Sequence, residues 1–454
     1  MVGVGTFMSA LDGSVVNTAL PIIGEQTGAH FSSLEWVVLI YLLTMISLLL
    51  IVGRLGDIHG RKGLYMAGFI VFTCGSVLCG MSPSVGWLIA FRGLQAIGAA
   101  MMLALAPSVL TTAFPASERG RALGLQATVT YLGISTGPAL GGLLTHHFGW
   151  RSIFFINVPI GLAIIPLGYL ALRHDQGGQR RPFDPAGAVT LAMALSCLLF
   201  TLSKGHAMGW ENPLIMITAT ISALAFAAFV AIERKVEHPM LDMAMFANHT
   251  FSASTFAALM NYIASASVIF LMPFYLIGAC GYRVDIAGLL LTATSVVMAI
   301  VAAPAGWLSD RVGVRIPATL GAAFTVTGLL FLRTLGPGAP PVAIVMQLGL
   351  IGLGIGLFTS PNNSAIMASA PDHSQGIAGA ILAASRTTGQ ALGVAIAGML
   401  YMLRLHALEH SAAEPSAIAG AMHYATTVVA CLAIMGVVAS ATRGEVPGSH
   451  AEPE

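Results

Sequence analysis

Long apolar stretches recur along the whole chain and alternate with short polar segments. An apolar helix of about 20 residues crosses the hydrocarbon core of a bilayer, where only a helix or a closed barrel satisfies the backbone hydrogen bonds. We count fourteen such stretches, and each predicts a membrane-spanning helix. The predicted spans are 2–23, 34–55, 63–81, 85–113, 121–145, 153–172, 186–204, 213–233, 251–278, 285–309, 313–335, 342–368, 376–403 and 420–441.

The composition excludes a soluble globular protein. Of the 454 residues, 56% are hydrophobic and only 9% are charged, whereas about 25% are charged in an ordinary soluble protein. The net charge of +1 and the scattered basic residues argue against nucleic acid as a partner. The five cysteines show no ligand-like spacing, and the chain has no phosphate-binding loop. We therefore expect no metal, no cofactor and no use of ATP.

The basic residues predict the orientation, because Lys and Arg favour cytoplasmic loops. Thirteen of them follow even-numbered spans, five lie on the opposite side, and Arg92 and Arg386 fall inside spans. Both termini are therefore expected in the cytoplasm. The first stretch lacks the basic segment of a signal peptide, so we expect a retained helix.

An internal repeat organises the spans. The segment from Gly53 to Lys62 ends the second span, and a similar segment from Gly306 to Arg315 ends the tenth, 253 residues later. The glycine pairs Gly120/Gly376, Gly133/Gly389 and Gly137/Gly393 recur at an offset of 256. An offset of eight spans preserves orientation, which predicts parallel repeats. The predicted fold is an all-α membrane protein with two pseudo-symmetric six-helix bundles and two extra central helices.

The repeat also predicts the domain boundaries. We expect an N-terminal six-helix bundle at 1–172, a linker with two additional transmembrane helices at 173–250, a C-terminal six-helix bundle at 251–441 and a short polar cytoplasmic tail at 442–454.

Several motifs resemble one known family. The segment from Gly53 to Lys62 resembles the signature between the second and third helices of the major facilitator superfamily. Segments that resemble its 14-helix drug:proton antiporter branch are Leu11–Pro21, Arg92–Gly98, Gly133–Gly142, Gly149–Pro159 and Ser385–Gly393. The resemblance implies a multidrug efflux antiporter of the bacterial inner membrane, not an enzyme, and does not identify the compound carried.

Asp12 is the acid that lies well within a predicted span. A carboxylate at mid-membrane costs about 2.5 to 3.5 kcal/mol on insertion scales, so it usually faces a cavity or a partner. Asp12 lies at the edge of a polar arc that includes Asn17, which predicts a cavity-facing position. The resemblance implies a role in proton coupling or cation recognition. The alternative is that Asp12 only hydrogen-bonds neighbouring helices.

Arg92 and Arg386 are the two cations inside spans, one in each half. Because an unpaired guanidinium in hydrocarbon is costly, each is expected to meet a carboxylate, a carbonyl or water. The resemblance assigns Arg92 a role in proton transfer, and Gln95 lies on the same helix face. Gln390 shares the face of Arg386. Either arginine could instead be a structural strut.

Two glycine-rich segments are candidate gates. Gly133, Gly137 and Gly141 place a small residue at every fourth position, which lets membrane helices approach closely, and Pro138 can bend the helix. The resemblance assigns to this antiporter motif, which includes Gly142, the closing of the outer half of the cavity. The alternative is ordinary helix packing, which would explain the glycines without transport, and the full Gly-Pro-x-x-Gly-Gly context favours the antiporter motif.

The loop after the second span is the candidate cytoplasmic gate. The resemblance implies that Asp57 and Arg61 latch the two halves, and a carboxylate there would gain from a helix dipole. The alternative is a solvated turn whose charges orient the protein. The candidate gate residues are Gly53, Asp57, Gly60, Arg61, Lys62 and, in the second copy, Asp310.

Other polar residues are weaker candidates. Those that could line the cavity are Asn157, Asn261, Tyr262, Gln347, Asn362 and Gln390. Glu35 and Asp285 lie near the outer ends of spans, where we expect their charges to reach water.

These features predict a secondary active transporter that exports small amphipathic, cationic compounds in exchange for protons by alternating access. The alternative is a dedicated proton-coupled exporter of a single metabolite, antibiotic, anion or lipid, the last two drawn in by Arg92 and Arg386. A membrane-embedded enzyme or receptor would need a catalytic cluster or metal site that the sequence does not show. The expected partners are lipophilic small molecules, protons and the bilayer, and we expect a monomer.

Overall fold

The computed structural model describes residues 1–114, 118–171, 184–236, 243–370, 375–408 and 414–444. Over these residues the regular secondary structure is entirely helical. The elements are α1 (Val2–Thr27), α2 (Phe31–His59), α3 (Arg61–Gly80), α4 (Val85–Ala113), α5 (Arg119–Phe148), α6 (Ser152–Phe155), α7 (Asn157–Ala171), α8 (Pro185–Met208), α9 (Pro213–Glu233), η2 (Met243–Ala247), α10 (His249–Phe274), η3 (Tyr275–Ala279), α11 (Val284–Val312), α12 (Arg315–Phe331), η4 (Leu332–Thr334), α13 (Pro341–Ala368), α14 (Gln375–Leu408) and α15 (Glu414–Thr442).

Each of the fourteen predicted spans coincides with a helix, and α6 and α7 together form the sixth. Within the described residues, thirteen stretches are long and apolar enough to cross a membrane. α5 is not among them, although its 30 residues are long enough to cross. The predicted all-α membrane fold is confirmed.

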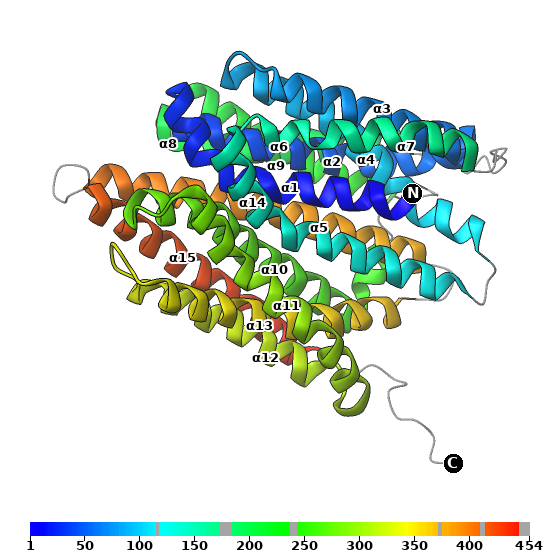
Figure 1. Cartoon of the computed structure of the whole chain (residues 1–454). Helices are drawn as coiled ribbons and strands as arrows, with labels where there is room; N and C mark the ends of the chain where they lie inside the picture. The colour runs from blue at the N-terminus through cyan, green and yellow to red at the C-terminus, as the bar shows by residue number, and fades with distance from the viewer. Residues whose placement is uncertain (115–117, 172–183, 237–242, 371–374, 409–413, 445–454) are drawn as a thin grey trace.

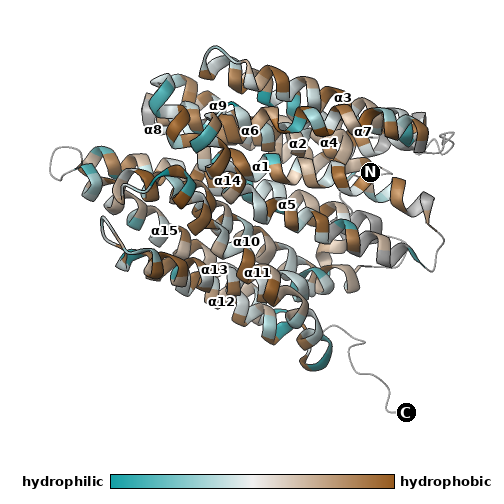
Figure 2. Ribbon diagram, in the orientation of Figure 1, coloured by the Kyte–Doolittle hydropathy of each residue, from teal (hydrophilic) through white to brown (hydrophobic). Residues whose placement is uncertain are grey.

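The helices form two bundles (Figure 1). In the first bundle, α1 packs along α5 and α3 along α4; in the second bundle, α10 packs along α14 and α12 along α13. These pairs are equivalent in the sequence repeat. Hydrophobic residues occur along the length of the helices (Figure 2), as helices that cross a membrane require.

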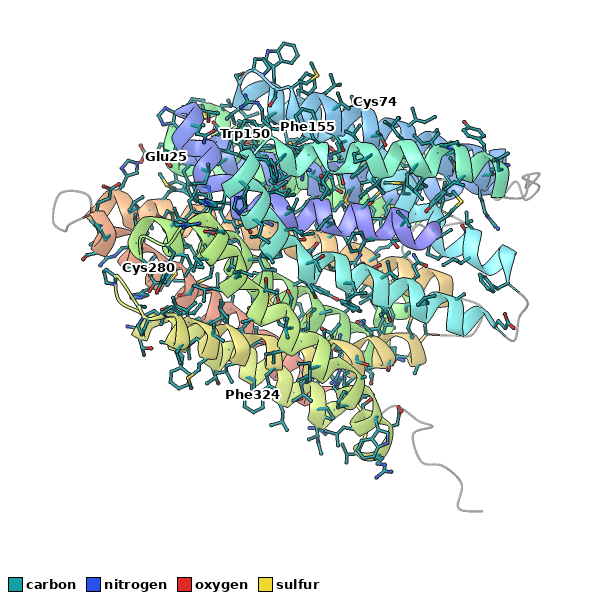
Figure 3. All side chains as sticks on the ribbon, in the orientation of Figure 1. Glu25, Cys74, Trp150, Phe155, Cys280 and Phe324 are labelled. Carbon is teal, nitrogen blue, oxygen red and sulfur yellow. The ribbon has the colours of Figure 1, made fainter. Side chains whose placement is uncertain are left out.

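The two bundles meet along two seams. The first seam joins α5 to α11, and the second seam joins α2 to α14; α8 contacts both α2 and α14. We call the end of the molecule where α1 begins the inner end. Glu25 and Cys280 lie at the opposite, outer end (Figure 3).

Glycines allow the closest helix approaches. Ser14 Oγ on α1 donates a hydrogen bond to the Gly133 carbonyl on α5 at 3.4 Å, and Ser267 Oγ on α10 donates to the Gly393 carbonyl on α14 at 3.0 Å. A Cβ atom on Gly393 would lie only 2.5 Å from the Ile263 carbonyl oxygen. Since this neighbour is backbone, the helices would have to separate to admit a side chain.

We therefore expect Gly393→Ala to lower the free energy of unfolding by about 1 to 3 kcal/mol, the usual cost of overpacking. Gly379→Ala on the same helix is the matched control, because a Cβ atom there meets nothing within 4 Å. Thermal unfolding in detergent measures both variants. Equal stability of the two would contradict the packing argument.

Candidate functional site

A buried ion pair joins α1 to α4. Arg92 Nη1 donates to Asp12 Oδ2, and the exposed fractions of the two side chains are 1% and 0%. Arg92 Nε also donates to the Val37 carbonyl at 3.3 Å, and the guanidinium carbon lies 4.1 Å from the centroid of the Tyr41 ring. The guanidinium is thus held on three sides by α1 and α2.

Two amide side chains complete the surroundings of the carboxylate. Gln95 Nε2 and Asn157 Nδ2 donate to Asp12 Oδ1 at 2.8 and 3.1 Å. The Gln95 carbonyl oxygen accepts a hydrogen bond from Arg92 Nη1 at 2.7 Å. We call Asp12, Arg92, Gln95 and Asn157 the polar cluster. Its members come from α1, α4 and α7, and all are fully or almost fully buried.

Sequence reasoning missed Ser76 on α3, whose Oγ accepts from Gln95 Nε2 at 2.8 Å. The contact depends on the preceding residue, because a Cβ atom on Gly75 would lie 2.7 Å from the Cα atom of Gln95. A glycine next to a serine in a predicted span was the available signal for this close approach of α3 and α4.

A cavity with a volume of about 130 Å³ lies between the two bundles, lined from α1, α2, α4 and α5 on one side and α10 and α14 on the other. Asn17, Arg92, Arg386 and Gln390 are among its lining residues, and Asp12 is not. The predicted cavity-facing position of Asp12 is therefore wrong in this conformation. Arg92, which pairs with Asp12, lines the cavity in its place.

The cavity wall offers unused hydrogen-bonding atoms. Ser9 Oγ and Asn17 Oδ1 are buried and have no partner among the described residues. Arg386 is half-buried and forms no ion pair with a described carboxylate. An apolar cavity with a few converging polar groups is typical of a small-molecule site.

Of the weaker candidates, Gln390 lines this cavity and the others do not. Gln347 Nε2 donates to Thr334 Oγ1 at 2.9 Å near the outer end. Asn261 lines a small pocket within the second bundle, and Asn362 accepts a hydrogen bond from Arg443 at 2.9 Å. Tyr262 packs against Gly389 and interacts electrostatically with Arg386 and with Tyr131 of α5, so it lies near the contact between the bundles. The sequence could not separate these positions, because the neighbour that each polar side chain meets depends on how the helices pack.

The antiporter motif has two contact faces. Gly133, Gly137 and Gly141 face α1, whereas Pro138 and Gly142 face α11 across the first seam. A Cβ atom on Gly142 would lie 3.1 Å from the Asp285 Cα atom. The motif therefore belongs both to the packing of the first bundle and to the contact between bundles near the outer end.

The candidate cytoplasmic gate is described only in part. The side chain of Asp57 lies outside the described residues. Gly60 joins α2 to α3 with φ of 92°, a conformation that favours glycine. Lys62 Nζ donates to the Tyr169 carbonyl of α7 at 2.8 Å, within the first bundle, and Asp310 is exposed.

Two expectations about the outer end are wrong. Glu35 and Asp285 are buried rather than open to water, because the two seams cover them. Arg283 Nη2 donates to Asp285 Oδ2 at 2.8 Å and to His146 Nε2 of α5 at 2.6 Å, a polar contact across the first seam.

Comparison with known proteins identifies relatives over nearly the whole chain. The family profile described as Major Facilitator Superfamily matches residues 2–244 and 254–452. Riboflavin transporter RibZ of Clostridioides difficile is 34% identical over 96% of this chain and 94% of its own. Multidrug resistance protein Stp of Mycobacterium tuberculosis is 31% identical over 91% and 78%, and the Tetracenomycin C resistance and export protein of Streptomyces glaucescens is 31% identical over 89% and 75%.

Solved structures share the fold. A bacterial homologue of the human lysosomal transporter Spinster, in an inward-facing and unoccupied conformation, superposes with a TM-score of 0.71 over 97% of this chain and 96% of that chain. The sequence identity is 17%, so this likeness is one of fold alone.

The ion pair predicts coupled effects on stability. We expect Asp12→Asn and Arg92→Gln each to lower the free energy of unfolding by about 3 to 5 kcal/mol, because each leaves one buried charge unpaired. The double variant is expected to lose less than the sum of the two. Denaturant unfolding in detergent measures all three, and additive losses would contradict the pairing.

Proposed function

The chain belongs to the major facilitator superfamily and is a membrane transporter, and from this premise we propose that it exports small amphipathic compounds in exchange for protons by alternating access. The observation that carries this proposal is the buried Asp12–Arg92 ion pair next to a cavity between the two bundles. The names of its relatives refer to riboflavin transport, multidrug resistance and antibiotic export, which supports a small-molecule cargo.

Asp12 carries the transported proton in this proposal. Protonation neutralises the carboxylate and removes its Coulomb attraction for Arg92, which then needs another partner. Arg92 lines the cavity as well as contacting Asp12. A proton on Asp12 therefore changes the charge presented at the cavity wall, which couples proton binding to the substrate site.

Alternating access would open the two ends in turn. The described contacts across the seams gather near the outer end, where Gly142 meets α11 and Gly398 meets Glu35 of α2. The antiporter motif closes this end, and the candidate gate residues around Asp57 and Arg61 close the other. We place that other end in the cytoplasm of a bacterium, together with both termini, from the distribution of basic residues.

Two classes of substrate are candidates, and they differ in charge. A cationic preference, expected from the sequence, requires Asp12 to leave Arg92 and reach the cavity. The second candidate, an anion or an electron-rich neutral compound, is favoured by Arg386, which lines the cavity without a carboxylate partner among the described residues. The described geometry supports the second candidate better, because both charged lining residues, Arg92 and Arg386, are cations.

We expect Asp12→Asn to abolish efflux driven by a proton gradient in proteoliposomes, because an amide cannot release a proton. Glu25→Gln is the matched control on the same helix, since Glu25 is exposed at the outer end (Figure 3). Rates are compared at equal amounts of folded protein. Wild-type coupling in the Asp12→Asn variant would contradict the role of Asp12.

Arg386→Gln is expected to raise the half-saturating concentration of anionic amphipathic compounds about 10- to 100-fold, the worth of a hydrogen bond to a charged group. Arg404→Gln serves as the control, because Arg404 lies on the same helix and is exposed. Transport of a panel of anionic, neutral and cationic compounds measures the effect. A strict preference for cations that Arg386→Gln leaves unchanged would favour the first candidate.

A further inference from the structure

Glu35 is a second buried carboxylate, two residues before Val37 on α2, whose carbonyl accepts the hydrogen bond from Arg92. The exposed fraction of Glu35 is 2%, although it lies only one turn from the start of the helix. α14 and α8 cover it, at the outer end of the second seam. The proposed mechanism makes no use of this acid.

The surroundings of Glu35 suit a neutral acid better than an anion. Ser203 Oγ of α8 donates to Glu35 Oε2 at 2.8 Å, while Oε1 is buried without a partner among the described residues. From α14 the carboxyl group meets Gly398, whose added Cβ atom would lie 3.0 Å from Glu35 Cδ. A buried carboxylate with one neutral donor is costly, whereas the protonated form carries no charge to bury.

The charged group that faces Glu35 from α8 is Lys204. Its Nζ atom donates to Ser32 Oγ at 3.1 Å and forms no ion pair with Glu35. α14 contributes a glycine at the contact and therefore no charge. No described cation thus compensates Glu35 directly, in contrast to Arg92 beside Asp12.

The sequence repeat shows that the packing does not require an acid here. At the offsets of 253 and 256 residues, Glu35 corresponds to Gly288 and Gly398 corresponds to Gly142. Gly288 and Gly142 meet at the first seam, where a Cβ atom on Gly288 would lie 3.1 Å from the Gly142 Cα atom. The two seams therefore contain equivalent helix contacts. The first seam has a glycine at both positions, whereas the second seam has a carboxyl group at one of them.

We propose that Glu35 is a second proton-binding site, which takes a proton from the outer solution and thereby favours closure of the second seam. When α2 and α14 separate, water reaches the carboxyl group and permits its ionisation. When they close, the carboxyl group must hold its proton. Proton binding and closure therefore favour each other reciprocally.

This proton is not transported. It enters Glu35 from the outer solution when the seam opens and returns to the same solution, because the carboxyl group lies on the outer side of the cavity, about one turn of α2 from the lining residue Val38. The inference rests on the alternating access of the proposed function. It adds a dependence of outer closure on external pH while leaving the number of exchanged protons unchanged.

The test measures the outer end directly and needs no substrate. Spin labels on His30→Cys and Arg404→Cys, both exposed positions flanking the second seam, report its width in a chain whose native cysteines are replaced by serine. In vesicles, the ratio of closed to open molecules is expected to rise as pH falls from about 8 to about 5, by up to tenfold per pH unit for one proton. Glu35→Gln is expected to stay closed across this range, and Glu25→Gln to follow the unsubstituted chain.

Two further variants keep the test decisive. In an Asp12→Asn background the pH response of the seam is expected to persist, which separates this site from the one in the proposed function. Ser203→Ala removes a hydrogen bond that Glu35 makes in the closed seam, so closure is expected to need more protonation and its midpoint to move to lower pH. An unchanged pH response in Glu35→Gln, or its loss in Asp12→Asn alone, would overturn the proposal.

Discussion

The rest of the structure depends on the ion pair between Asp12 and Arg92. Two opposite charges buried in a membrane bundle are tolerable only while each remains satisfied, so α1 and α4 cannot separate without exposing both. Gln95 and Asn157 add donors to the carboxylate, and Val37 and Tyr41 hold the guanidinium. Because a single proton removes the main attraction, the interaction that stabilises the first bundle is also the one that a proton can switch.

The contacts between the bundles are of a different kind. Gly142 meets the backbone of Gly288, and Gly398 meets the carboxyl group of Glu35; neither contact involves an ion pair. The glycine contact of the first seam can open and close with little electrostatic cost, whereas an ion pair across a seam would hold it shut. The Asp12–Arg92 ion pair is thus kept inside one bundle. The surfaces between the bundles combine glycine contacts with aromatic packing, in which Phe31 of α2 meets Phe270 of α10 and Tyr401 of α14.

Much of the fold could be predicted from the sequence, because it follows from the lengths of the apolar stretches, the spacing of the repeated motifs and the composition. The fourteen spans and the repeat depend on apolar runs and on motif spacing, and Arg92, Gln95 and Asn157 could be named as polar residues inside spans. The direction in which each side chain points could not be predicted. A helical wheel places Asp12 at the edge of an arc, but which neighbour occupies that edge depends on the close approach of α4. The same limit applies to Glu35, whose burial depends on α8, a helix without a counterpart in the repeat.

The two central helices give the repeat a functional asymmetry. α8 packs on the second seam and supplies Ser203 to Glu35, and the repeat gives the first seam no equivalent of α8. A symmetric pair of six-helix bundles would respond to a proton at both seams or at neither. Adding α8 and one carboxyl group to a single seam makes its closure depend on protonation while the first seam keeps a contact between two glycines. The chain thereby separates the proton transported at Asp12, which in the proposed cycle reaches both sides of the membrane, from the proton at Glu35, which exchanges with the outer solution alone.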